Sequence, residues 1–249
     1  MTPDEKLAYA ELLAWQKQMQ QPPSMFNRLA RRVQARLNAL LPERVHKAIT
    51  ATIKQMVRAV LFGSMYSTRQ PVVAMPLAAR ETSIRTRIRY YRNTAAAEGA
   101  VTGAAGFFLG LADFPLLLGI KLKLLFDIAA LYGYDVKEYP ERLYILHIFQ
   151  LTFSSQHTRN EVYRRLADWE TYRQTLPTDV NAFDWRTFQQ EYRDYIDLAK
   201  LAQLLPIIGA AVGAVANYRL LVQLGETAMN CYRMRHFAVE GSEIIPLPS

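Results

Sequence analysis

The sequence predicts an all-α fold, a single helical domain. Apolar residues recur at intervals of three and four along most of the 249-residue chain, and no stretch shows the sustained apolar–polar alternation of a half-buried strand. A chain of this length can bury one large core without disulfides or a structural metal. Its single cysteine, Cys231, excludes an intramolecular disulfide framework. We expect a central pair of glycine-rich apolar helices covered by amphipathic helices.

The charges divide the chain unevenly. Residues 1–92 contain sixteen Lys or Arg against five Asp or Glu, whereas residues 93–249 contain fourteen against seventeen, within a net charge of +8. We interpret residues 1–92 as a basic amphipathic helical arm, 93–239 as a helical core and 240–249 as a mobile tail. A basic arm indicates an anionic partner, either a membrane surface or nucleic acid. It is also compatible with a solvated basic surface that binds nothing.

The start of the chain lacks the features of a secretory signal. Acidic residues occupy it at Asp4, Glu5 and Glu11, and no apolar segment with a small-residue cleavage site follows. The same acids argue against an organelle transit peptide. We therefore expect a cytoplasmic protein, peripheral on the cytoplasmic face of the membrane.

Two basic amphipathic helices are predicted in the arm, over 24–41, where Ser24 is a good N-cap, and over 45–61. In soluble proteins such helices usually pack their apolar face on the core. In a membrane interface the same pattern places the basic side chains among lipid phosphates. Both alternatives stay open, and one helix can pack while the other is free. The candidate membrane-surface residues are Arg28, Arg31, Arg32, Arg36, Lys47, Lys54 and Arg58.

Residues 85–92 mix Arg and Tyr in the way that nucleic-acid surfaces do. On a helix, however, Arg87 points nearly opposite to Arg85 and Arg89, so the segment forms no continuous reading face. The chain also has no zinc-finger spacing and no RNP-type aromatic motif. We therefore rank nucleic-acid binding below membrane association as an alternative.

Two uncharged segments with regularly spaced small residues, 99–112 and 201–218, are the most distinctive feature. Each interior glycine costs a helix about 0.5–1 kcal/mol relative to Ala, so a close packing contact must compensate. We expect the two segments to pack on each other. The alternative is a hairpin that dips into the bilayer, because the second segment reaches the lower length limit of a membrane span. The candidate packing residues are Gly99, Gly103, Gly106, Gly110, Gly209 and Gly213.

Four polar residues accompany the apolar segments: Glu98, Asp113, Asn217 and Glu226. Glu98 and Asp113 suit helix N-termini, where a carboxylate is favourable. We expect caps and a buried hydrogen-bond network that holds the helices in register. The alternative is a cavity for a lipid head group or another amphiphile, in a carrier or an enzyme.

No catalytic or metal-binding motif occurs. The four histidines have no ligand spacing, and the chain contains neither His-Glu-x-x-His, nor Gly-x-Ser-x-Gly, nor a glycine-rich phosphate loop. We therefore assign no catalytic residue, no metal and no cofactor.

Four motifs follow one another in the apolar half of the chain. In order they are Gly103-x-x-Gly106-x-x-x-Gly110-x-x-Asp113-Phe-Pro115, Ile128-Ala129-x-x-Tyr132-Gly133-Tyr134-Asp135, Leu205-Pro206-x-x-Gly209-x-x-x-Gly213-x-x-x-Asn217-Tyr218 and Ala228-x-x-x-Tyr232-Arg233. Their order and separation resemble the EcsC protein family over about residues 93–239. The resemblance implies a product encoded beside ABC-transporter genes and brings no established biochemical activity.

The hypothesis drawn from these observations is a non-enzymatic, peripheral membrane-associated protein. Its expected partner is an anionic membrane surface or a membrane protein complex, reached through the basic arm.

Overall fold

The computed structural model describes residues 1–21, 43–61, 70–104, 114–154, 158–184, 186, 188 and 210–239. These residues form eight α-helices and one short 3-10 helix, and no β-strand occurs among them, which confirms the predicted all-α fold. The elements are α1 (Pro3–Gln20), α3 (Glu43–Leu61), α4 (Leu77–Ala104), α6 (Phe114–Leu131), α7 (Tyr139–Phe153), α8 (Arg159–Ala167), α9 (Trp169–Gln174), η1 (Val180–Ala182) and α12 (Ala210–Val239).

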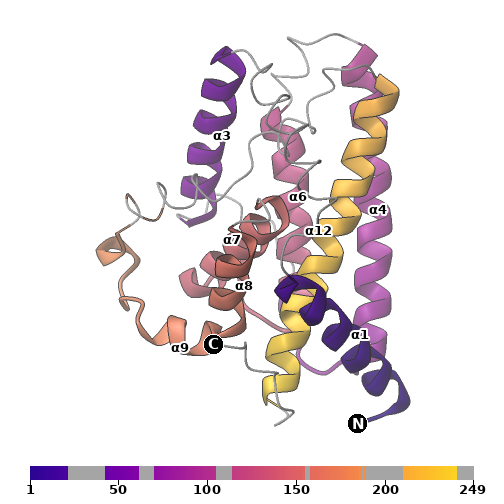
Figure 1. Ribbon diagram of the computed structural model, residues 1–249, viewed down its shortest axis with the longest axis vertical. Helices are drawn as coiled ribbons and strands as arrows, with labels where there is room; N and C mark the ends of the chain where they lie inside the picture. Colours follow the sequence, from indigo (N-terminus) through magenta and orange to yellow (C-terminus); the bar gives the residue numbers. More distant parts are fainter. Residues whose placement is uncertain are drawn as a thin grey trace.

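The two longest helices, α4 and α12, lie side by side in opposite directions along the long axis of the molecule (Figure 1). Helix α6 packs against both. Helix α4 is continuous across residues 92 and 93, so the basic arm and the core share one helix. This antiparallel pair is the frame on which the other helices are placed.

A glycine permits the close approach of α4 and α12. A Cβ atom added at Gly225 of α12 would lie 2.5 Å from Cδ1 and 2.6 Å from Cγ1 of Ile88 in α4. Real Cβ atoms do not approach so closely, since the repulsion would displace the side chain or the helix. The Ile88 side chain therefore occupies the space that any larger residue at position 225 would need.

The glycines expected to form the central contact are only partly described. Gly99 and Gly103 lie in α4 and Gly213 in α12, at positions whose surroundings are not described. The other three, Gly106, Gly110 and Gly209, lie outside the described residues, as does the predicted helix over 24–41. Helices α4 and α12 pair with each other, whereas a central pair of glycine-rich helices and packing through those six glycines remain predictions.

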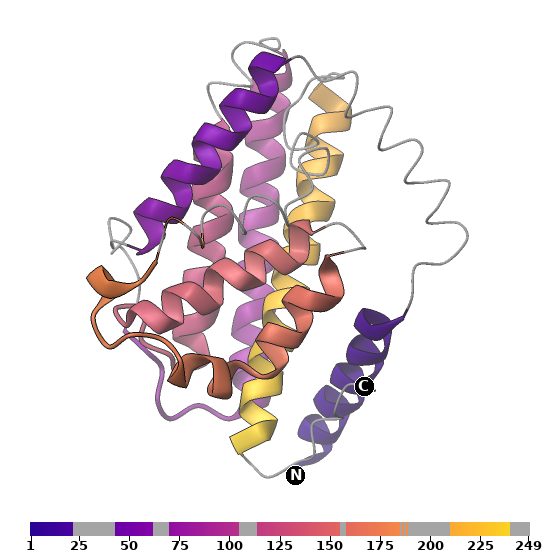
Figure 2. The same cartoon turned by 60° about the vertical axis from the view of Figure 1, so that its left-hand side comes forward.

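Helix α7 is enclosed on every side. All its residues except Pro140 are buried, and it contacts α3, α6, α8 and α12. Figure 2 shows α7 and α8 crossing the long helices. A helix enclosed in this way must satisfy its polar side chains inside the protein, because water cannot reach them.

The peripheral helices α1 and α3 follow from local sequence. Thr2 and Glu5 form a capping box that starts α1, which packs on α4, α8 and α12. Helix α3 confirms the helix predicted over 45–61, and its apolar residues Ile53, Met56 and Val60 are buried against α6 and α7.

Helix α6 ends in a glycine turn. Gly133 has φ +91°, in the left-handed region that favours glycine, and the amide of Tyr134 reaches back to the carbonyl of Ala129 at 3.0 Å. The guanidinium of Arg80 in α4 donates to the carbonyl of Tyr132 at 2.6 Å. The turn thus fixes the end of α6 against α4.

Over the part of the chain that the structure describes, no helix is both long enough and apolar enough to cross a membrane.

We expect Gly225→Ala to lower the free energy of unfolding by about 1–3 kcal/mol, because its Cβ overlaps Ile88. Gly119→Ala in α6 is the matched control, since its Cβ would meet nothing within 4 Å and the helix gains about 1 kcal/mol in propensity. Urea unfolding of both variants measures the two effects. Equal changes in the two proteins would contradict the close contact.

Candidate functional site

One face of α3 presents a row of cations. Its described exposed residues are Lys47, Ala51, Lys54, Gln55 and Arg58, and none of them is acidic. Positions 47, 51, 54 and 58 succeed one another at three and four spacing, so they share one side of the helix. The opposite side is buried. Helix α3 therefore packs by its apolar face and turns its basic face outward. The other four candidate surface residues, Arg28, Arg31, Arg32 and Arg36, lie outside the described residues.

A buried ion pair joins α4 to α12. The Arg233 guanidinium binds the Glu81 carboxylate through two bonds, Nε to Oε1 at 2.6 Å and Nη2 to Oε2 at 2.7 Å. It also reaches Glu11 of α1 at 2.8 Å, and Arg85 lies 3.5 Å from the same Glu11. We call Glu11, Glu81, Arg85 and Arg233 the Arg233 cluster. It links three helices with equal numbers of opposite charges.

A second buried pair joins α7 to α12. Nη1 of Arg235 donates to Oε2 of Glu141 at 2.7 Å, and the Tyr232 hydroxyl donates to Oε1 at 2.6 Å. The Arg235 guanidinium lies 3.8 Å from the Tyr134 ring centroid and 4.7 Å from that of Tyr144. We call Tyr134, Glu141, Tyr144, Tyr232 and Arg235 the Arg235 cluster. The rings of Tyr134 and Tyr144 lie against the guanidinium, and the buried Glu141 pairs with it, while the exposed Glu170 lies 3.3 Å from its Nε.

A tyrosine stack connects the two clusters. The rings of Tyr132 and Tyr232 lie 5.2 Å apart and nearly parallel. The Tyr132 hydroxyl lies 3.3 Å from Oε1 of Glu81, so the stack runs from the carboxylate of one cluster to the carboxylate of the other. Ion pairs, phenols and stacked rings thus form a continuous polar path through the described interior.

The pKa shifts in the Arg235 cluster follow from burial and pairing. Burial raises the pKa of Glu141, and the neighbouring Arg235 and the hydroxyl of Tyr232 oppose that rise. Burial lowers the pKa of Arg235, but Glu141 and the surrounding phenols outweigh it, so the net shift is upward. Burial likewise raises the pKa of the Cys231 thiol, which lies beside this cluster on α12. The Arg235 guanidinium is therefore always charged, and Glu141 is the main compensation for burying that charge.

The four predicted polar residues do not converge on one described site. Asn217 is buried and accepts a 3.0 Å bond from Nζ of Lys121, which is itself buried. Glu226 is exposed on α12, where its carbonyl accepts a bond from Asn230. Glu98 lies in α4 with its side chain undescribed, and Asp113 lies outside the described residues, immediately before the first residue of α6. The capping roles expected of Glu98 and Asp113 stay predictions.

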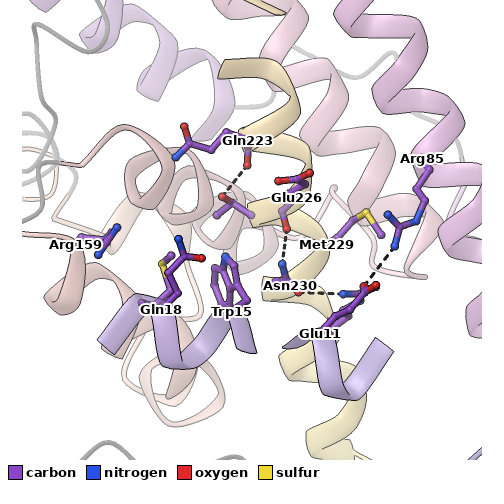
Figure 3. A pocket seen from close by; sticks show the side chains of 12 residues that line it. Glu11, Trp15, Gln18, Arg85, Arg159, Gln223, Glu226, Met229 and Asn230 are labelled. Carbon is purple, nitrogen blue, oxygen red and sulfur yellow. Dashed lines mark hydrogen bonds and ion pairs between the residues drawn. The ribbon is translucent and has the colours of Figure 1, made fainter. Parts of the chain in front are cut away.

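A cavity of about 470 Å³ lies between α1, α4, α8 and α12 (Figure 3). Helix α1 contributes Glu11, Trp15, Gln18 and Met19. Helix α12 contributes Gln223, Glu226, Thr227, Met229, Asn230 and Arg233. Arg85 of α4 and Arg159 of α8 complete the lining. The cavity therefore adjoins the Arg233 cluster and has a mixed polar and apolar wall.

His147 is a buried residue of α7 in an aromatic setting. Its Nδ1 lies 3.0 Å from Oε1 of Gln150, and the rings of Trp169, Tyr172 and Phe188 surround it. Burial, with a smaller contribution from Arg165, lowers the pKa of His147 to about 3. The described residues contain no group of three His, Cys, Asp or Glu side chains that could hold a metal ion.

Sequence reasoning named Tyr134, Tyr232 and Arg233 within motifs but did not predict the two ionic clusters, and it missed Glu81, Glu141 and Arg235. Glu81 and Arg233 are 152 positions apart, and no local spacing relates them. A usable signal was present in α7, where Glu141 and Arg142 directly precede an apolar run in the same helix. Charges inside an enclosed helix require partners, but the sequence did not show that the partner of Glu141 would be on α12.

These features define an all-α protein with two buried ionic clusters and a polar cavity. The sequence profile of the EcsC protein family matches residues 6–237, and the chain belongs to this family. It is 45% identical over 233 residues to "Protein EcsC" of Bacillus subtilis (strain 168), covering 93% of this chain and 96% of that one. It is 30% identical over 245 residues to "Uncharacterized protein YdbA" of the same organism, covering 90% of each chain. No solved structure matches.

We expect Glu141→Gln to lower the free energy of unfolding by about 3 kcal/mol, because the buried Arg235 charge then keeps only the exposed Glu170, 3.3 Å from its Nε, as a carboxylate partner. Urea denaturation provides the measurement. Adding Arg235→Met should restore part of the loss, since the poorly compensated charge is then removed.

Glu138→Gln is the control for the same chemical change at the surface. Glu138 pairs with Arg173 at 2.9 Å, with both side chains exposed, so the loss there should stay below about 1 kcal/mol. Equal decreases in the free energy of unfolding for Glu138→Gln and Glu141→Gln would show that the buried pair stabilises the protein no more than the exposed pair.

We expect His147 to destabilise the protein as the pH falls. The unfolded chain protonates this histidine near its ordinary pKa of about 6.5, whereas the folded protein does not until about pH 3. The folded state therefore loses up to about 2 kcal/mol of stability between about pH 7 and pH 5. The difference in unfolding free energy between the wild type and His147→Gln, followed over that range, isolates this effect. A difference that is independent of pH would refute it.

Proposed function

We propose that this protein associates peripherally with an anionic membrane surface through the basic face of α3. The observation that carries the proposal is the division of α3, which buries its apolar residues in the body and exposes Lys47, Lys54 and Arg58 along one side. In this arrangement the helix docks by charge and does not insert. The excess of cations in residues 1–92 acts in the same direction.

Lipid phosphates suit this face better than nucleic acid does. The cations follow one another along a straight side of the helix, and the described exposed residues among them are Ala51 and Gln55, without an aromatic side chain on which bases could stack. A flat anionic surface can engage all three charges at once. Each basic residue near such a surface contributes about 1 kcal/mol, a contribution that salt screens.

The basic segment before α3 extends the proposal. Arg28, Arg31, Arg32 and Arg36 add four cations within nine residues, and Pro22-Pro23 separates them from α1. Together with the α3 face they supply the several charges that reversible membrane binding needs. No enzymatic activity forms part of this proposal.

The test is co-sedimentation of the full chain with phosphatidylglycerol-containing or pure phosphatidylcholine vesicles across a salt series. We expect binding to the anionic vesicles alone, weakening as salt rises. Reversal of Lys47, Lys54 and Arg58 to Glu should weaken it at least about a hundredfold, from about 1 kcal/mol per charge. A second variant reverses Arg28, Arg31, Arg32 and Arg36.

The matched control reverses Lys6, Lys17 and Lys137, which are exposed elsewhere, and should bind like the wild type apart from the change in net charge. Equal losses in the control and the α3 variant would contradict a specific face. Absence of vesicle binding would overturn the proposal, and capture by a membrane protein or tight binding to duplex DNA would then name the other partner class.

A further inference from the structure

Arg159 carries a charge that no described group neutralises. It is half-buried, and its Nε is inaccessible to solvent and has no hydrogen-bond partner. Burial lowers the pKa of its guanidinium, and no carboxylate opposes that shift. An arginine nevertheless stays protonated at any physiological pH. A partly desolvated cation without a partner costs stability, so its presence calls for an explanation.

Its position in the helix does not provide one. Arg159 is the first residue of α8, and a cation is unfavourable at a helix N-terminus. Arg164 and Arg165 lie in the last turn of the same helix, where a cation is favourable. Helix stability therefore accounts for those two arginines and works against Arg159.

The surroundings of Arg159 favour an anion. The residue lines the cavity between α1, α4, α8 and α12, and Figure 3 shows Gln18 toward the same side of the view as Arg159, with Gln223 above them on α12. Both carry amide N–H groups that can donate to an anion. At the other end, Glu11 and Glu81 are paired with Arg85 and Arg233, so the charge there is balanced. The unmatched positive charge of the cavity is concentrated at Arg159.

We propose that the Arg159 end of this cavity binds the phosphate group of a small organic phosphate ester. A guanidinium fork matches phosphate oxygens and binds them strongly. Gln18 of α1 and Gln223 of α12 line the same cavity, so two other helices supply amide donors for a group with several terminal oxygens. A planar carboxylate would be satisfied by the fork alone.

The rest of the cavity suits the organic part of such an ester. Its volume of about 470 Å³ lies within the usual range of small-molecule sites, about 300–1,000 Å³. Trp15 supplies apolar surface between its two ends (Figure 3), and Met19 is a further apolar residue of the lining. A soluble phosphate ester and the head group of a phospholipid present the same chemistry here, and the choice of probes separates them.

One lining residue acts against an anion and therefore provides a test of opposite sign. Glu226 contributes its carboxylate to the rim of the cavity on α12. Its negative charge repels a bound phosphate, so its removal should strengthen binding. A site for a cation would show the reverse response.

The experiment is calorimetric titration of the full chain, with the intrinsic tryptophan fluorescence, to which Trp15 of the lining contributes, as a second signal. The probes are inorganic phosphate, glycerol 3-phosphate and dihexanoyl phosphatidylglycerol below its micelle concentration, with glycerol as the uncharged control. We expect saturable binding of the phosphate-bearing probes. Tighter binding of glycerol 3-phosphate indicates a soluble ligand, and tighter binding of the short-chain lipid indicates a head group.

Three variants decide the assignment. Arg159→Gln should weaken binding about tenfold or more, Arg164→Gln on the same helix should leave it unchanged, and Glu226→Gln should strengthen it severalfold. The melting temperature of Arg159→Gln should equal or exceed that of the wild type, because an unneutralised charge is removed.

The proposal is overturned if Arg159→Gln and Arg164→Gln bind alike, or if no probe binds saturably below about 10 mM. A large fall in the melting temperature of Arg159→Gln would also count against it, since Arg159 would then serve the fold. Helices α1 and α3 lie at opposite ends of the molecule (Figures 1 and 2), so the charge reversals on α3 should leave phosphate binding intact. The two proposals can thus fail independently.

Discussion

The bidentate ion pair between Arg233 and Glu81 is the interaction on which the arrangement of the long helices depends. A guanidinium removed from water must find a carboxylate in a matching geometry, or the folded state is strongly destabilised. That requirement allows one register of α12 along α4. Gly225 lies two helical turns away on α12, where the absence of a side chain lets Ile88 enter and brings the helix axes close enough for the pair to form.

Apolar packing alone would specify this interior less sharply. Hydrophobic contacts are non-directional, and the enclosed helix α7 could slide or rotate at modest cost if all its residues were aliphatic. Glu141 removes that freedom, since its two oxygens must meet Arg235 and Tyr232 of α12. The stacked rings of Tyr132 and Tyr232 then join this constraint to the Arg233 cluster, so that α4, α6, α7 and α12 are placed by one connected set of directional contacts.

Features that repeat along one helix could be predicted from the sequence. Contacts between helices that are distant in the sequence could not. The face of α3 was readable because its buried and exposed residues alternate with the helical period. Helix α7 has no such period, since it is buried all round. Gly225 lies outside the two uncharged segments and is flanked by Glu226, so the segment pattern did not mark it as the contact with Ile88. Arg159 resembles any basic residue of a short helix until its half-buried and unpaired environment is known.

The burial of Cys231 on α12 also determines how the chain responds to electrophiles. Cys231 is buried, and its backbone carbonyl accepts a 2.7 Å hydrogen bond from the Tyr144 hydroxyl of α7. Neither a thiolate nor an alkylating reagent can exist at that position while α7 and α12 remain together, because burial disfavours the charge and excludes the reagent. The rate at which the folded protein reacts with such a reagent therefore measures how often these two helices separate. Alkylation of the single thiol of the chain reports the opening of the core.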